Sequence, residues 1–218
     1  MVLHGNFAQV GTDTRFVPHN MFTLVFAGSE HRVSFERQDS NAVLRWVSGA
    51  NESRRVYLDT PIHSVWLAED SIFYGDSSVG DLHLNGHTAK FMGNLENLRN
   101  MGMGNVYVDG DLISTQLTGI GYAGTMIVNG SVYLHTSLWL ANANSRLSIR
   151  GNLYNGMDPS VVSTIVLSNG ALLDLKGDYI QGHGLNNAGF VTTFNARVQL
   201  VGQLIAKDSF SCRRESTF

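Results

Sequence analysis

From about residue 80 onward, apolar and polar residues alternate in short stretches, and each stretch crosses a glycine. Before Gly110, for example, Val106 and Val108 stand on either side of Tyr107. Alternation with a period of two predicts β-strands that turn one side to a core and the other to solvent. Apolar residues at three- and four-residue spacing, which would indicate an amphipathic helix, do not persist for a dozen residues anywhere. The pattern therefore predicts an all-β fold.

The glycine-centred stretches repeat at a nearly constant interval. They are LHLNGHTAKF from Leu82, VYVDGDLIST from Val106, MIVNGSVYLH from Met126, LSIRGNLYNG from Leu147, LDLKGDYIQG from Leu173 and VQLVGQLIAK from Val198. Their central glycines lie 24, 20, 21, 26 and 25 residues apart, at Gly86, Gly110, Gly130, Gly151, Gly177 and Gly202. An antiparallel sandwich offers no reason for such a step. The repeat predicts a parallel β-helix (β-solenoid) with coils of about 20–26 residues, and the usual chirality of parallel crossovers makes it right-handed.

Each glycine is expected to mark a corner where the chain turns from one strand to the next. Glycine reaches positive φ without a steric penalty, and Asn or Asp tolerates the neighbouring position. On this interpretation, Asn85–Gly86, Asp109–Gly110 and Asn129–Gly130 are equivalent corners.

A longer self-similarity relates the two ends of the chain, because residues 1–36 resemble residues 177–210. GNFAQ at Gly5 matches GDYIQ at Gly177, and FTLVFAG ending at Gly28 matches ARVQLVG ending at Gly202. The offsets are 172 and 174 residues, which indicates a superordinate tandem unit of roughly 170 residues. We expect residues 1–218 to form one solenoid body cut from a longer array, with neighbouring repeats as partners and a poorly ordered tail over 208–218.

Composition narrows the possible functions. A net charge of -3, with 15% charged residues, disfavours nucleic acid as a partner, since phosphate-backbone binding needs clustered Lys and Arg. The single Cys212 cannot form an internal disulfide. No apolar run is long enough to span a bilayer, and the first residues lack the layout of a signal peptide, so any export signal is expected outside this segment.

Candidate catalytic and metal-binding residues are sparse. The strongest acidic cluster is Asp81, Asp109 and Asp111, but the alignment of the repeats places Asp109 with Asn85 and Asp111 with His87, at turn positions that accept any small polar residue. His83 and His87 are four residues apart, yet none of the eight histidines forms a zinc-binding pattern. A Gly-x-Ser-x-Gly nucleophile motif is missing. The sequence therefore predicts no metal, no cofactor and no catalytic residue.

Aromatic residues on the repeats are the best candidates for binding a ligand. They are Tyr107, Tyr133, Trp139, Tyr154 and Tyr179. If they project outward from successive coils, they form a lateral ladder that can stack on sugar rings or enter an apolar groove of a partner. The alternative is ordinary packing between coils.

Several strings, taken together, resemble tandem segments of large secreted or surface proteins of Gram-positive bacteria. They are GNFAQ followed by FTLVFAGSEHRVSFE, then DLHLNGHTAKFMGNL, NVYVDGDLIS and LLDLKGDYIQG. The resemblance implies a β-solenoid and export, but it implies no catalytic residue. The stretch 37–64, with Trp46 and Arg54–Arg55, departs from the pattern.

These observations favour a non-catalytic structural, adhesive or spacer segment of a larger secreted or cell-surface protein, with a polysaccharide or cell-surface partner. Two alternatives remain open. Parallel β-helices also carry polysaccharide lyases and glycoside hydrolases, and such an enzyme would need paired carboxylates on one lateral face. A carbohydrate-binding module would instead use outward tyrosines.

Overall fold

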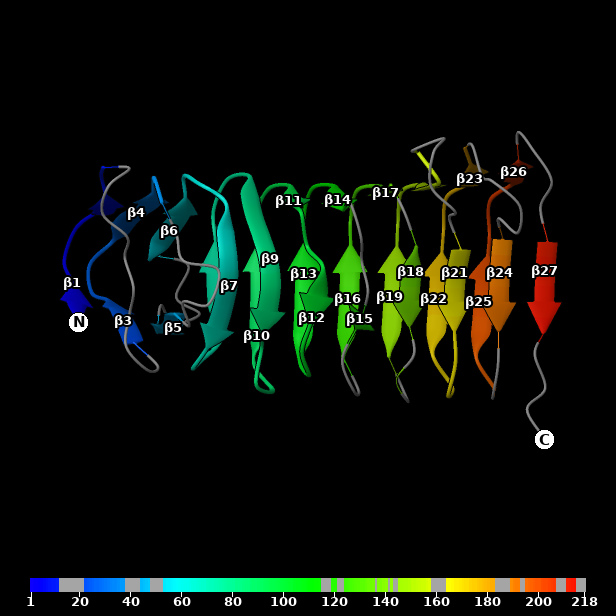
Figure 1. The fold of residues 1–218 in the computed structure, drawn as a ribbon, viewed down its shortest axis with the longest axis horizontal. Helices are drawn as coiled ribbons and strands as arrows, with labels where there is room; N and C mark the ends of the chain where they lie inside the picture. The colour runs from blue at the N-terminus through cyan, green and yellow to red at the C-terminus, as the bar shows by residue number, and fades with distance from the viewer. Residues whose placement is uncertain are drawn as a thin grey trace.

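The computed structural model is an elongated all-β body with the N-terminus at one end and the C-terminus at the other (Figure 1). The residues it describes are 1–11, 22–37, 44–47, 53–114, 119–120, 124–135, 137–140, 142, 145–157, 164–182, 189–192, 195–206 and 211–214. Within these ranges every regular element is a strand. In the same ranges, no helix is long and apolar enough to cross a membrane.

The strands pair in parallel, each with its counterpart one coil away. The ten-stranded sheet runs through β2 (Phe7–Gln9), β4 (Glu30–Phe35), β6 (Arg55–Leu58), β8 (Ser71–Phe73), β10 (Thr88–Phe91), β13 (Asn105–Val108), β16 (Thr125–Val128), β19 (Arg146–Ile149), β22 (Leu172–Leu175) and β25 (Arg197–Leu200). Residues paired across this sheet are 17 to 26 positions apart in the sequence. The predicted parallel β-solenoid is confirmed, and some of its coils, around β8 and β10, are shorter than predicted.

The remaining strands form two further sheets. The thirteen-stranded sheet follows β1 (Val2–Leu3), β3 (Phe22–Phe26), β5 (Leu44–Val47), β7 (Ile62–Leu67), β9 (Ser77–His83), β11 (Leu95–Glu96), β14 (Leu112–Ser114), β17 (Val132–Leu134), β20 (Leu153–Asn155), β23 (Tyr179–Gln181) and β26 (Leu204–Ala206), with β12 (Asn100–Met101) and β15 (Gly119–Ile120) as a branch. The four-stranded sheet holds β18 (Leu138–Leu140), β21 (Thr164–Leu167), β24 (Gly189–Thr192) and β27 (Ser211–Arg214).

The solenoid changes from two strands per coil to three at β9. The long β9 pairs with both β11 and β12, and its residues Val79 and Gly80 face three residues, Asn97 to Arg99, on the next coil. This one-residue excess is a β-bulge, which bends the strand that carries it. Asn97 lies in this bulge and has a φ of 61°. From β18 onward, the third strands form the separate four-stranded sheet.

The core changes with coil shape. In the two-strand coils, aromatic rings stack along the axis: the ring centroids of Phe26 and Trp46 are 5.2 Å apart, and those of Phe73 and Phe91 are 5.0 Å apart. Trp46, in the stretch that departs from the repeat pattern, is fully buried in this stack. Beyond β10 the same register holds aliphatic residues, beginning with Val108.

The glycine corners are present, but the predicted positive φ is found only at Gly86 among the six repeat glycines and is wrong at the other five. Six stacked glycines lack positive φ: Gly93, Gly110, Gly130, Gly151, Gly177 and Gly202. Each is instead required by close approach of the backbone, because a Cβ on Gly151 would lie 2.6 Å from the carbonyl oxygen of Gly130. Backbone hydrogen bonds link the same glycines, such as Gly151 N to Gly130 O at 2.9 Å.

One of the predicted corners is out of register. Asn85 and Gly86 both have positive φ, at 53° and 88°, and form a turn outside the glycine stack. Gly93 occupies the position that the sequence alignment gave to Gly86, because Phe91 pairs with Val108. Asn85–Gly86 therefore has a different geometry from the other two predicted corners, Asp109–Gly110 and Asn129–Gly130.

The strings at the two ends of the chain occupy different sheets. The GNFAQ string forms β2 in the ten-stranded sheet, whereas GDYIQ leads into β23 in the thirteen-stranded sheet. FTLVF forms β3 in the thirteen-stranded sheet, whereas RVQL forms β25 in the ten-stranded sheet. Within the expected tail, residues 211–214 form β27 and pair with β24, and the other residues after 207 lie outside the described ranges.

Substituting Gly151 by Ala should destabilise the fold by about 1–3 kcal/mol, because its Cβ would meet backbone that cannot move without breaking the coil spacing. Gly5→Ala is the matched control, since a Cβ at Gly5 meets nothing within 4 Å. Urea unfolding followed by circular dichroism measures both. Equal midpoints for the two variants would show that the close approach is not limiting.

Candidate functional site

The residue after each stacked glycine forms a polar ladder along one corner. Its side-chain oxygen accepts a hydrogen bond from the backbone N–H of the equivalent residue in the next coil. The pairs are Asn94 to Asp76 (2.8 Å), Asp111 to Asn94 (2.8 Å), Ser131 to Asp111 (2.7 Å), Asn152 to Ser131 (3.1 Å), Asp178 to Asn152 (2.9 Å) and Gln203 to Asp178 (2.8 Å). Short side chains with an oxygen acceptor suit this reach, which explains why Asp, Asn and Ser follow the glycines.

The three predicted acidic residues do not converge. Asp111 belongs to the ladder, whereas Asp109 accepts from the Asn129 side chain at 3.0 Å and lies 4.0 Å from the Lys90 ammonium. Asp81 instead bonds the Arg99 guanidinium at 3.0 Å and an Asn side chain. No group of three His, Cys, Asp or Glu residues within the described ranges is placed to hold a metal ion.

The repeat alignment of these residues was wrong at one coil. Strand pairing places Met92 beside Asp109 and Asn94 beside Asp111, where the sequence alignment placed Asn85 and His87. The error follows from centring that repeat on the wrong glycine.

The five predicted aromatic residues are distributed over three sheets rather than one ladder. Tyr107 is exposed on the ten-stranded sheet and Trp139 is exposed on the four-stranded sheet. Tyr133 and Tyr154 are stacked on the thirteen-stranded sheet, with centroids 4.7 Å apart and planes within 2°. Tyr179 is completely buried.

The stacked pair presents little ring face to a ligand. Tyr133 pairs in register with Ile113 on one side and Tyr154 on the other, and Tyr154 is followed by Ile180. Parallel rings on adjacent strands cover one another's faces and leave mainly their edges outward. This arrangement favours packing between coils over stacking on a sugar.

The expectation that Tyr179 projects outward is wrong, because it pairs with the inward Leu153 and not with Tyr154. Its hydroxyl donates to the Gln181 side chain and accepts a 3.1 Å bond from Asn155, both buried. Burial raises the pKa of Tyr179 to about 12, against an opposing hydrogen bond from Asn155.

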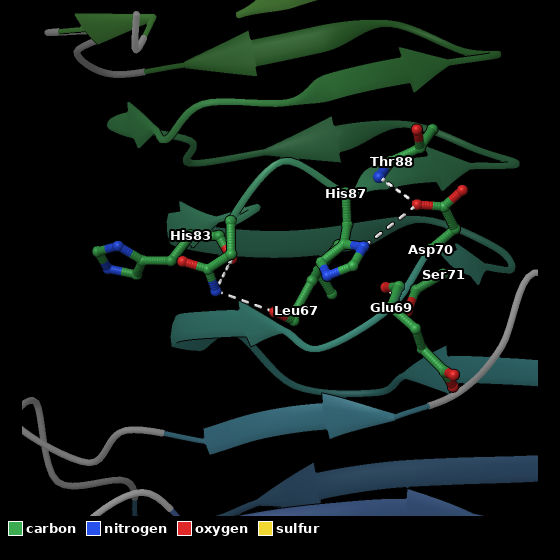
Figure 2. A network of polar contacts seen from close by, with 8 residues as sticks. Leu67, Glu69, Asp70, Ser71, His83, His87 and Thr88 are labelled. Carbon is green, nitrogen blue, oxygen red and sulfur yellow. Dashed lines mark hydrogen bonds and ion pairs between the residues drawn. The ribbon is translucent and has the colours of Figure 1, made fainter.

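The histidines are scattered, and the two that are closest in sequence do not share a face. The rings of His83 and His87 point to different sides of one corner (Figure 2). His83 packs on Trp66 with ring centroids 4.2 Å apart, and burial lowers its pKa although Asp81 opposes the shift. His87 lies 3.6 Å from Asp70. His19 and His183 lie outside the described residues.

The corner between β7 and β8 and the turn that precedes β10 carry a polar network. The Asp70 carboxylate accepts the Thr88 backbone N–H at 2.8 Å and faces His87 (Figure 2). On the other side of the turn, the Asn85 amide donates to the Leu67 carbonyl at 2.9 Å. These bonds hold the Asn85–Gly86 turn against the preceding coil.

Two grooves meet at this corner. The first, of about 270 Å³, is lined by Arg45, Trp66, Leu67, Ala68, Asn85 and His87. The second, of about 330 Å³, is lined by Asp70, Ser71, Ile72, Thr88, Lys90 and Tyr107. We call them together the corner grooves. Each combines an aromatic residue with charged and hydrogen-bonding groups.

Sequence reasoning missed most of the corner grooves. Tyr107 was predicted to bind a ligand, but Arg45, Trp66, Asp70 and Lys90 were not. They lie on or beside strands β5, β7, β8 and β10, and only coil stacking brings them together. The one available signal was the alternation in Ile62–Leu67, which places Trp66 beside buried neighbours.

Replacing Asp111 by Ala should lower the free energy of unfolding by about 1 kcal/mol, because the Ser131 N–H loses its acceptor. Asp111→Asn keeps an oxygen at the same reach and should lie near the wild-type value. Urea denaturation at neutral pH compares the two. Equal losses for Ala and Asn would assign the effect to charge and not to the ladder.

The buried Tyr179 predicts alkaline sensitivity. In the unfolded chain this phenol ionises near its usual pKa of 10.0, whereas in the folded protein it stays neutral up to about 12. The stability that it contributes is therefore complete below pH 10 and is lost as the pH rises towards 12. Tyrosinate absorbance should show a group titrating near pH 12 that disappears in Tyr179→Phe. It should persist in the control Tyr154→Phe, and its persistence in Tyr179→Phe would refute the assignment.

Comparisons with known proteins add no relative. No protein-family model, curated protein or solved structure matches this chain.

Proposed function

We propose that this chain is a non-catalytic structural, adhesive or spacer segment of a larger secreted or cell-surface protein. The observation that carries the proposal is the corner ladder, in which acidic and amide side chains satisfy the backbone of the next coil instead of facing a substrate. Repetition of the ladder over successive coils supports a rod whose length is set by coil number.

The placement of the acidic residues supports the non-catalytic reading. An enzyme that cleaves sugars by the usual route needs two carboxyl groups on opposite sides of one bond. Asp81, Asp109 and Asp111 each bond a different partner at a different place. In the corner grooves, the Asp70 carboxylate lies beside His87 and accepts a hydrogen bond from the backbone N–H of Thr88.

Adhesion is the part of the proposal that the surface supports. The corner grooves place the exposed Tyr107 and the half-buried Trp66, which packs on His83, on either side of a polar corner, which suits edge and hydrogen-bond contacts with a polysaccharide. We propose a polysaccharide or another cell-surface component as the partner. The likeness of several strings to tandem segments of Gram-positive surface proteins supports the same location.

The test asks whether the chain cleaves polysaccharides and whether it has the shape of a rod in solution. We expect the purified chain to leave neutral and acidic polysaccharides intact, with no new reducing ends and no unsaturated products. Small-angle scattering should show a rod, because stacked coils add about 4.8 Å each along the axis. If the wild-type protein cleaved a polysaccharide and the Asp70→Asn variant did not, that result would contradict the non-catalytic proposal.

A further inference from the structure

A third groove lies on the ten-stranded sheet and begins at β19, two coils beyond Tyr107 of the corner grooves. It has a volume of about 320 Å³ and is lined by Arg146, Gly170, Leu172, Asn195, Arg197 and Gln199. We call it the arginine groove. Among the described residues, its lining contains two arginines and no acidic residue.

Strand register places the two arginines on one line. Arg146 on β19 pairs with Leu172 on β22, which pairs with Arg197 on β25. Strands are about 4.8 Å apart, so the two backbones stand about 10 Å apart along the solenoid axis. The side chains on one line of paired residues share a face of the sheet. Both arginines therefore flank the shorter Leu172 on that face.

No ion pair among the described residues neutralises either of these arginines. Arg32 and Arg99 form ion pairs with Asp59 and Asp81, at 2.7 Å and 3.0 Å. Arg146 and Arg197 are exposed, and neither forms an ion pair with any residue in the described ranges.

The nearest acidic residue on the same strands is itself neutralised. Asp174 stands beside Gln199 in the register, and its carboxylate binds the Lys176 ammonium at 2.8 Å. Its charge is therefore already opposed by a cation on its own strand end, and the field in the groove stays positive.

The shape of the groove is set by a turn between coils. Gly170 has a φ of 81°, and a Cβ placed on it would meet nothing within 4 Å. The space above this glycine is therefore open to a ligand. Asn195, at a φ of 60°, and Gln199 add amide donors and acceptors beside the two guanidinium groups.

We propose that the arginine groove binds the carboxylate groups of an acidic polysaccharide chain that runs along the solenoid axis. A guanidinium group donates two parallel hydrogen bonds to a carboxylate, so two arginines in line suit successive acidic units of one polymer. The amides of Asn195 and Gln199 suit sugar hydroxyls. Two guanidinium groups suit contact with a few acidic units, whereas tight binding of a nucleic-acid backbone needs a longer run of Lys and Arg.

This inference deepens the adhesive part of the proposed function and rests on it. It assigns the chemical class of the partner, an acidic saccharide, and a second contact surface two coils beyond the corner grooves. A chain that touched both would be held at two points, which strengthens attachment without a larger site.

The experiment measures binding of polygalacturonate fragments by calorimetry at low salt, with methyl-esterified fragments as the uncharged probe. We expect wild-type protein to prefer the acidic form. Arg146→Gln and Arg197→Gln should each weaken its binding by about tenfold or more, as expected for loss of a charged hydrogen bond. Arg150→Gln, an exposed arginine on the same coil outside the groove, should bind as wild type does. Circular dichroism confirms that all variants are folded.

The outcomes separate the inference from the proposed function. Acidic fragments that bind all variants equally would overturn the arginine groove and leave adhesion through the corner grooves standing. Equal binding of acidic and esterified fragments would also overturn it, because charge would then play no part. If polyuridylate bound as tightly as the acidic fragments, the groove would bind any polyanion, and the assignment to an acidic saccharide would be overturned. Cleavage of the fragments would contradict the proposed function itself.

Discussion

Successive coils of this protein hydrogen-bond to one another through their corners as well as along their strands. At the stacked glycines the backbone comes so close to the preceding coil that no Cβ fits, as between Gly151 and Gly130. The following residue then supplies a side-chain oxygen for the next coil's N–H, as Asp111 does for Ser131. Parallel strands separated by a corner would otherwise leave backbone donors unpaired near the core, at a cost comparable to a lost hydrogen bond. The position of every other strand depends on this spacing being kept.

Coil shape varies while the corner stays constant. The bulge at Asn97 divides one long strand into two and adds a third face to the later coils. A third strand brings further apolar side chains inward, such as Leu138 and Leu140, so smaller residues fill the interior. Large aromatic rings are accordingly concentrated in the earlier coils, where Phe73 and Phe91 stack in the space between two sheets. The core composition thus follows the number of strands per coil.

Side chains in the corner ladder bind backbone groups, and side chains in the core pack against one another. The side chains available for contact with another molecule are therefore those that point outward. The tyrosine pair Tyr133 and Tyr154 uses its ring faces to bind neighbouring coils, and the acidic residues of the ladder use their oxygens for backbone. Among the described residues, the corner grooves and the arginine groove gather several outward side chains with hydrogen-bonding or ring surface. Both are shallow surfaces on a long body, which favours extended partners over small molecules enclosed in a pocket.

The sequence by itself determined the fold class, the approximate coil length and the glycine-marked corners, because period-two alternation and a fixed repeat leave few other architectures. It did not determine register at Gly86, since Asn–Gly is a turn signal in more than one geometry, and the glycine stack is fixed by approach between coils. It also misplaced Tyr179, whose burial follows from pairing with Leu153. The grooves were decided by tertiary structure alone. Arg146 and Arg197 are 51 positions apart in the chain, and only stacking at the strand spacing brings them to one face.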